Sequence, residues 1–123
     1  MSKKILIVDD EEDIRKLTAL RLRKAGYEVH AVSSGDKVLA AVVAFSPDLV
    51  LLDLRLPKKD GLDICRQLKY DPQFSWIPVI LFTAVVPQGL EDRLRDSRAD
   101  AFVLKPYRSD DLLEKIRRCL EKK

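Results

Sequence analysis

The sequence predicts an α/β fold in which five parallel strands form one doubly wound sheet with five helices on both faces. Five short runs rich in Val, Ile and Leu alternate with longer amphipathic segments. This alternation is typical of βαβ units around a buried parallel sheet. With 123 residues, 46% hydrophobic and 35% charged, the chain also has the size and composition of one ordinary globular domain. Right-handed crossovers between such strands distribute the helices over both faces.

The first half of the chain divides into three strands and three helices. Gly26 can take the left-handed conformation that ends the first helix, and Pro47 ends the second helix before a new strand. Asp60 and Gly61 form a turn that leads into the third helix. The predicted strands here are 5–8, 28–32 and 49–52, and the predicted helices are 12–25, 36–45 and 62–70.

The second half is predicted to add strands 79–82 and 101–104 and helices 88–97 and 110–121. The last helix has one apolar face, made by Leu112, Leu113, Ile116, Cys119 and Leu120, that would pack on the sheet. No linker, internal repeat or low-complexity tract interrupts the pattern. We therefore expect residues 1–123 to form a single domain.

Composition argues against several classes of function. No apolar run approaches the roughly 18 residues of a membrane span, and the four apolar residues before Asp9 are too few for a signal peptide, so we expect a cytoplasmic protein without membrane contact. The net charge of +3 comes from cations spread over helix surfaces, which gives no reason to expect direct nucleic-acid binding. Cys65 and Cys119 are expected to be buried, reduced thiols.

Polar and charged groups follow four of the five predicted strands. Asp9 and Asp10 follow the first strand, Asp53 the third, Thr83 the fourth and Lys105 the fifth. In open parallel sheets, ligands bind outside the carboxyl ends of the strands. These five residues would therefore meet in one crevice if the first, third, fourth and fifth strands are neighbours.

The group types indicate phosphoryl chemistry beside a metal ion. Three carboxylates crowded together repel one another unless a cation lies among them, and hard oxygen ligands suit Mg²⁺ or Mn²⁺. Asp53 is the best placed nucleophile for a phosphorus atom. Lys105 can pair with Asp53 and later with a phosphoryl oxygen, to which the Thr83 hydroxyl can also donate. These three are the candidate catalytic residues, and Asp53 is the candidate phosphoacceptor.

The chain resembles the receiver domains of two-component response regulators over its whole length. The acidic pair after the first strand is Asp9-Asp10, and the third strand with its loop is Leu51-Leu52-Asp53-Leu54-Arg55-Leu56-Pro57. The other two matching motifs are Thr83-Ala84 after the fourth strand and Lys105-Pro106 after the fifth. Each motif alone would be weak, whereas together they are highly specific. The resemblance implies strand order 2-1-3-4-5 and a switch that catalyses only its own phosphorylation and dephosphorylation.

The resemblance also implies roles for single residues. Asp10 and Asp53 would ligate the metal directly, Asp9 would do so through water, and the backbone carbonyl of Arg55 would complete the protein ligands. The bond between Lys105 and Pro106 would be cis.

The resemblance further implies partners and a switch. A sensor histidine kinase or a phosphotransfer protein would supply the phosphoryl group. Phosphorylation would rearrange Thr83, the aromatic Phe102 and segment 84–98, and so change the surface of 88–97, 101–104 and 110–121 for a downstream effector that the sequence does not identify. Dimerisation through the same surface is an option that the sequence leaves open.

Two features depart from the family pattern: the segment Val85-Val86-Pro87, which puts two apolar residues directly after Thr83-Ala84, and the pair Ser97-Arg98. Ser97-Arg98 stands where a glycine is common, so a left-handed helix end there would be strained. Arg55 and Val85 lie two residues after Asp53 and Thr83, where we expect them to set the lifetime of the phosphoryl group, Arg55 by covering the site and Val85 by excluding water.

Two other classes of protein share part of this pattern of residues. A phosphatase of the haloacid dehalogenase type also combines an aspartate nucleophile with Mg²⁺, Thr and Lys, but that class requires a second acid at the position of Arg55 and a larger domain. A flavin carrier of the same topology would place a phosphate beside acidic strand ends, which would repel it.

Overall fold

The computed structural model describes residues 2–56, 59–84 and 88–121. Its strands form one parallel sheet in the order β2-β1-β3-β4-β5, which confirms both the predicted fold class and the implied strand order. The strands are β1 (Lys4–Val8), β2 (Glu28–Val32), β3 (Leu49–Asp53), β4 (Val79–Thr83) and β5 (Ala101–Leu104). The helices are α1 (Glu12–Lys24), α2 (Val38–Phe45), α3 (Gly61–Tyr70), α4 (Leu90–Ser97) and α5 (Ser109–Glu121), with a 3₁₀ turn at Gly35–Lys37 before α2.

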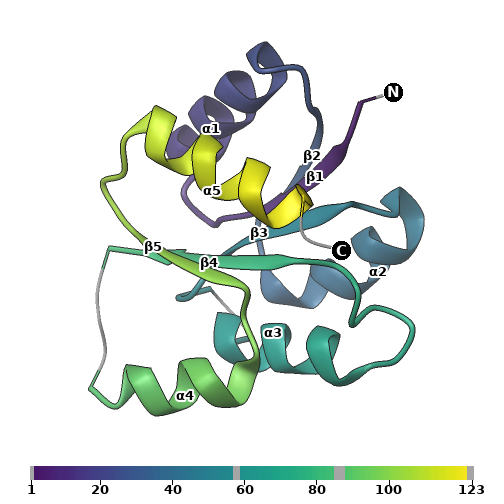
Figure 1. Cartoon of the computed structure of the whole chain (residues 1–123), viewed down its shortest axis with the longest axis vertical. Helices are drawn as coiled ribbons and strands as arrows, with labels where there is room; N and C mark the ends of the chain where they lie inside the picture. Colours follow the sequence, from purple (N-terminus) through teal and green to yellow (C-terminus); the bar gives the residue numbers. More distant parts are fainter. Residues whose placement is uncertain (1, 57–58, 85–87, 122–123) are drawn as a thin grey trace.

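The helices cover the sheet in two layers (Figure 1). Helices α1 and α5 pack on one face, and α2, α3 and α4 pack on the other. Strand β3 shows how the sequence supplies both cores, because Leu49 and Leu51 face α1 and α5 whereas Val50 and Leu52 face the other layer. Successive side chains of a strand point to opposite faces, so a continuous apolar run is what a strand covered on both sides requires.

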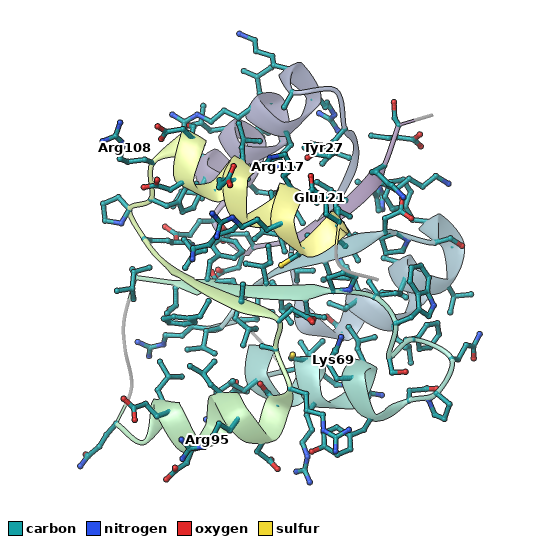
Figure 2. All side chains as sticks on the ribbon, in the orientation of Figure 1. Tyr27, Lys69, Arg95, Arg108, Arg117 and Glu121 are labelled. Carbon is teal, nitrogen blue, oxygen red and sulfur yellow. The ribbon has the colours of Figure 1, made fainter. Side chains whose placement is uncertain are left out.

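Apolar side chains fill the space between the sheet and both helix layers, and long charged side chains such as Arg95 and Arg108 lie at the periphery (Figure 2). Cys65 and Cys119 are both buried free thiols, as predicted. Burial raises the pKa of the Cys65 thiol to about 12, so this group stays protonated and packs as a small apolar side chain. Among the described residues, none of the helices is both long and apolar enough to cross a membrane.

The helix ends agree with the predictions to within about two residues, and two of them are informative. Gly26 has φ +100° directly after α1, which confirms the predicted left-handed position. Helix α4 ends at Arg98 in the left-handed region, with φ 60° and ψ 29°. The backbone therefore keeps the left-handed ending without a glycine, at a cost of about 1 kcal/mol for the side chain's Cβ. The Arg98 guanidinium lies 4.3 Å from the centre of the Tyr70 ring and packs on it.

Candidate metal centre at the carboxyl edge of the sheet

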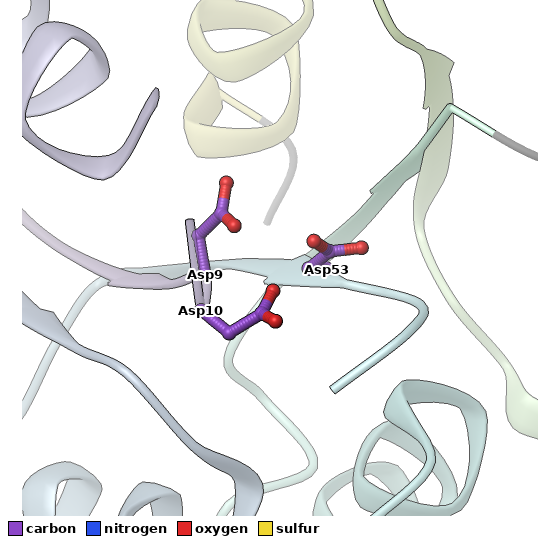
Figure 3. A group of neighbouring side chains, drawn as sticks. All are labelled: Asp9, Asp10 and Asp53. Carbon is purple, nitrogen blue, oxygen red and sulfur yellow. The ribbon is translucent and has the colours of Figure 1, made fainter. Parts of the chain in front are cut away.

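Three carboxylates meet where β1 and β3 end. One oxygen each of Asp9, Asp10 and Asp53 lies within 4.8 Å of the other two, and Figure 3 shows the three side chains converging from two neighbouring strands. Their convergence follows from the register, because Val8 of β1 pairs with Leu52 of β3. Asp9 and Asp53 are buried and Asp10 is exposed, so the cluster opens to solvent on the Asp10 side.

The donor set fits Mg²⁺ or Mn²⁺. Both ions prefer carboxylate oxygens and keep several waters, which suits a cluster with one open side. Asp9, Asp10 and Asp53 could each supply a ligand oxygen. No second cluster of three or more acidic, His or Cys side chains with this spacing occurs in the described part of the chain.

Lys105 is the cation that balances the buried carboxylates. Its Nζ lies 3.2 Å from Asp9 Oδ2, 3.2 Å from Asp53 Oδ2 and 3.4 Å from Glu11 Oε1. Strand β5 brings it there, because the Lys105 amide donates to the Thr83 carbonyl at 2.8 Å and so continues the pairing of β5 with β4. The following peptide bond to Pro106 is cis, as the resemblance implied.

Burial governs the electrostatics of the Asp53 carboxylate. It raises the pKa of Asp53 from 3.8 to about 6, against the lowering effects of the Arg55 amide, which donates to Oδ1 at 3.1 Å, and of Lys105. Burial alone would lower the pKa of Lys105, but the adjacent Asp53 and Asp9 carboxylates raise it. A bound divalent cation would add positive charge beside Asp53 and favour its ionised form, the form in which a carboxylate can act as a nucleophile.

Three of the other residues singled out from the sequence lie in the described part of the chain. Thr83 is the buried last residue of β4, and Phe102 of β5 is half-buried against the α2, α3 and α4 layer. The Arg55 side chain is exposed, and its carbonyl remains a candidate metal ligand. Val85 lies outside the described residues, so its expected role in excluding water stays a prediction.

Two neighbours of the cluster were not recognised as such from the sequence. A Cβ on Gly61 would lie 2.2 Å from the Asp53 carbonyl oxygen, so only glycine lets α3 begin this close to Asp53. In the sequence, the pair Asp60-Gly61 indicates a turn, but it does not indicate that Gly61 lies against the Asp53 carbonyl. The Glu11 amide donates to Asp9 Oδ1 at 3.0 Å while the Glu11 side chain reaches Lys105. Glu11 is one of five consecutive acidic residues at 9–13, and nothing in the sequence indicates which of them contacts Lys105.

Comparison with known proteins points to one family. The family model for the response regulator receiver domain matches residues 5–117. The DNA-binding dual master transcriptional regulator RpaA of a Synechocystis species is 37% identical over 121 residues, which are 97% of this chain and 49% of RpaA. The DNA-binding response regulator MtrA of Mycolicibacterium smegmatis is 37% identical over 122 residues, 95% of this chain and 50% of MtrA.

The fold gives the same result. The crystal structure of a CheY-like response regulator receiver domain protein from Methanospirillum hungatei superimposes with a TM-score of 0.91 at 30% identity, over 98% of this chain and 95% of that one. The chain spans about half the length of the two curated regulators.

Proposed function

The chain belongs to the response regulator receiver family of two-component signalling, and from this membership we propose that it accepts a phosphoryl group on Asp53 with the help of a bound Mg²⁺ or Mn²⁺. The observation that carries the proposal is the buried Lys105 ammonium, 3.2 Å from both Asp9 and Asp53, beside a cluster of three carboxylates. The arrangement provides a nucleophile, a set of metal ligands and a cation for the incoming phosphoryl oxygens.

The proposed reaction is an in-line transfer from the phosphohistidine of a sensor kinase or phosphotransfer protein. An Asp53 oxygen attacks phosphorus, the P–N bond breaks, and the histidine leaves as a neutral imidazole once its nitrogen has taken a proton. The Arg55 amide holds Asp53 Oδ1, which fixes the direction of the carboxylate. Lys105 moves from Asp53 to a phosphoryl oxygen, and Thr83 donates its hydroxyl to another. The metal, when bound, neutralises charge on the phosphoryl oxygens.

The metal ligands in this proposal are Asp10 and Asp53 directly, Asp9 through water, and the Arg55 carbonyl.

We further propose that residues 1–123 act as one receiver domain whose phosphorylation shifts Thr83 and Phe102. The shift would change the surface formed by α4, β5 and α5, which serves an effector. RpaA and MtrA are DNA-binding regulators about twice as long as this chain. Any effector function of a longer protein that contains this domain is therefore proposed only by extension from these two relatives.

A small phosphodonor tests the acceptor directly. Incubation with acetyl phosphate and Mg²⁺ should add one phosphoryl group, detected by intact mass, and the addition should vanish in Asp53→Asn and after chelation of the metal. Asp63→Asn is the matched control, because this carboxylate is exposed on α3, and it should be phosphorylated like the parent. Phosphorylation of Asp53→Asn at the parental rate would refute the assignment.

The switch needs a separate test. Phe102→Ala should reduce the difference in the surface between phosphorylated and free forms, measured by amide hydrogen exchange over α4, β5 and α5. An unchanged difference would remove Phe102 from the switch.

The lifetime of the phosphoryl group is tested by its rate of hydrolysis. This rate should change in Arg55→Asn and in Val85→Glu, and unchanged rates in both variants would show that these residues do not control the lifetime.

A further inference from the structure

Phe82 lies in β4 immediately before Thr83 and contacts Lys105, which forms with Asp9 and Asp53 the Lys105 cluster. Its backbone pairs with Asp53 of β3 on one side and with Val103 of β5 on the other. The side chain is fully buried in the core beneath α1 and α5. The Lys105 Nζ lies over this ring, 4.6 Å from its centre. From the sequence alone, Phe82 is only the last residue of the strand predicted at 79–82.

We propose that Phe82 is a positioning residue for Lys105, whose ammonium is held at the phosphoacceptor by the face of the aromatic ring. A cation within about 6 Å of a ring centre is attracted by the negative face of the π-system, and the attraction grows when the cation is withdrawn from water. Only 7% of the Lys105 side chain is exposed, so the ammonium is in the environment where this attraction is strongest. An aliphatic side chain would fill the same core volume without that attraction.

The ring differs from the other partners of Lys105 because its attraction does not change during the reaction. The three carboxylates around the ammonium are those of Asp9, Glu11 and Asp53. Asp9 and Asp53 are proposed above to serve the metal and to receive the phosphoryl group, so their charge toward Lys105 changes in each cycle. The ring carries no net charge to lose, and it keeps the ammonium in place while its partner changes from the Asp53 carboxylate to a phosphoryl oxygen. The inference thus rests on the proposed function.

The ring is itself held in orientation by a neighbour from another segment. Phe82 and Tyr107 meet edge to face, with ring centres 6.2 Å apart and planes at 78°. The Tyr107 hydroxyl forms a hydrogen bond of 2.5 Å with the Thr18 hydroxyl of α1. The ring that supports Lys105 is therefore fixed through contacts with the segment after β5 and, beyond it, with α1.

Stepwise fluorination of Phe82 tests the proposal without altering the packing much. Site-specific incorporation of 4-fluoro-, 3,5-difluoro- and 3,4,5-trifluorophenylalanine withdraws electron density from the ring face in steps. The rate constant for phosphorylation by acetyl phosphate at saturating Mg²⁺ should fall with each fluorine, to about one tenth with three, because a weakened ring face leaves the ammonium out of position in most chains. Equal rates across the series would overturn the proposal.

The control is the same series at Phe74, which is buried in the core on the opposite face of the sheet. That series should leave the rate unchanged, and a parallel fall in both series would overturn the proposal by assigning the effect to packing. Unfolding in urea, measured for both series, checks that the variants remain folded.

A second measurement does not depend on phosphorylation. In the metal-free chain the ring current of Phe82 should displace the NMR shifts of the Lys105 ε-methylene protons, and Phe82→Leu should return them toward ordinary lysine values while those of Lys69 stay fixed. Lys105 ε-methylene shifts that are the same in the parent chain and in Phe82→Leu would overturn the proposal. If the parent chain accepts no phosphoryl group, the proposed function fails, and these shifts alone decide whether the ring holds the ammonium.

Discussion

Two groups of ion pairs in this chain have similar geometry and very different surroundings. The Lys105 cluster joins Lys105 to Asp9 and Asp53 at 3.2 Å each, with side chains that are 7%, 0% and 6% exposed. The Arg93 cluster joins Arg93 of α4 to Asp60 and Asp63 at 3.1 and 3.6 Å, with side chains that are 46%, 38% and 72% exposed. The distances alone would rank the two clusters as near equals.

The difference in burial gives the clusters different tasks. Water screens the Arg93 cluster, so an exposed pair of this kind stabilises a protein by about 0 to 1 kcal/mol. The Lys105 cluster has lost its hydration, and removal of one partner leaves an uncompensated charge in the interior. The buried cluster should therefore be sensitive to any change in its charges, whereas the exposed cluster adds only a weak interaction between α4 and the start of α3. Substitution of Lys105 and of Arg93 should therefore have very different effects on stability.

The largest effect is expected from Lys105→Met. Without the ammonium, Asp9 and Asp53 face each other in the interior, and the free energy of unfolding should fall by about 3 kcal/mol at pH 8 in chelator. Mg²⁺ should restore part of this loss, because it replaces the missing cation. Urea titrations with and without the metal measure both effects. A loss below about 1 kcal/mol would mean that the buried cluster behaves like an exposed one.

The next effect concerns pH and Asp53. Folding raises the pKa of Asp53 to about 6 by burial, so the folded state binds this proton more tightly than the unfolded state does. The contribution of this group to stability is therefore greatest below about pH 4 and is lost as pH rises toward 6, by about 2 kcal/mol. Asp53→Asn lacks this loss, so its stability relative to the parent in metal-free buffer should increase across that window. A constant difference between pH 4 and pH 7 would contradict the raised pKa.

A smaller effect is expected at the end of α4. Arg98→Gly relieves the left-handed conformation of a non-glycine residue but removes the contact with Tyr70. Arg98→Ala removes the same contact and keeps the conformational cost. The glycine variant should therefore be more stable than the alanine variant by about 1 kcal/mol. Equal urea midpoints for the two variants would show that the backbone there is unstrained.

The smallest effect is expected from Arg93→Gln. Because all three side chains of its cluster are substantially exposed, the free energy of unfolding should change by about 0.5 kcal/mol or less, and added salt should reduce even this. The measurement is the same urea titration at low and high ionic strength. A loss equal to that of Lys105→Met would break the contrast between the two clusters.

Much of the fold could be predicted because its signals are local. The continuous apolar run at 49–52 predicts a strand covered on both faces, and Gly26 predicts the end of α1. The start of α2 was predicted less well. Residues 35–37 form a 3₁₀ turn, whereas the sequence predicted that the helix begins at residue 36. Helix ends depend on a few weak interactions, so tertiary packing shifts them easily.

The sequence by itself determined the residue types at the carboxyl ends of the strands, and with them the chemistry to be expected of Asp9, Asp10, Asp53, Thr83 and Lys105. Only the tertiary structure decided how these groups are solvated and supported. The raised pKa of Asp53, the close approach of Gly61 and the Phe82 ring beneath Lys105 all involve residues distant in sequence. Motifs specify which groups follow each strand, whereas burial and contact depend on strand order and helix packing, which bring separate segments together.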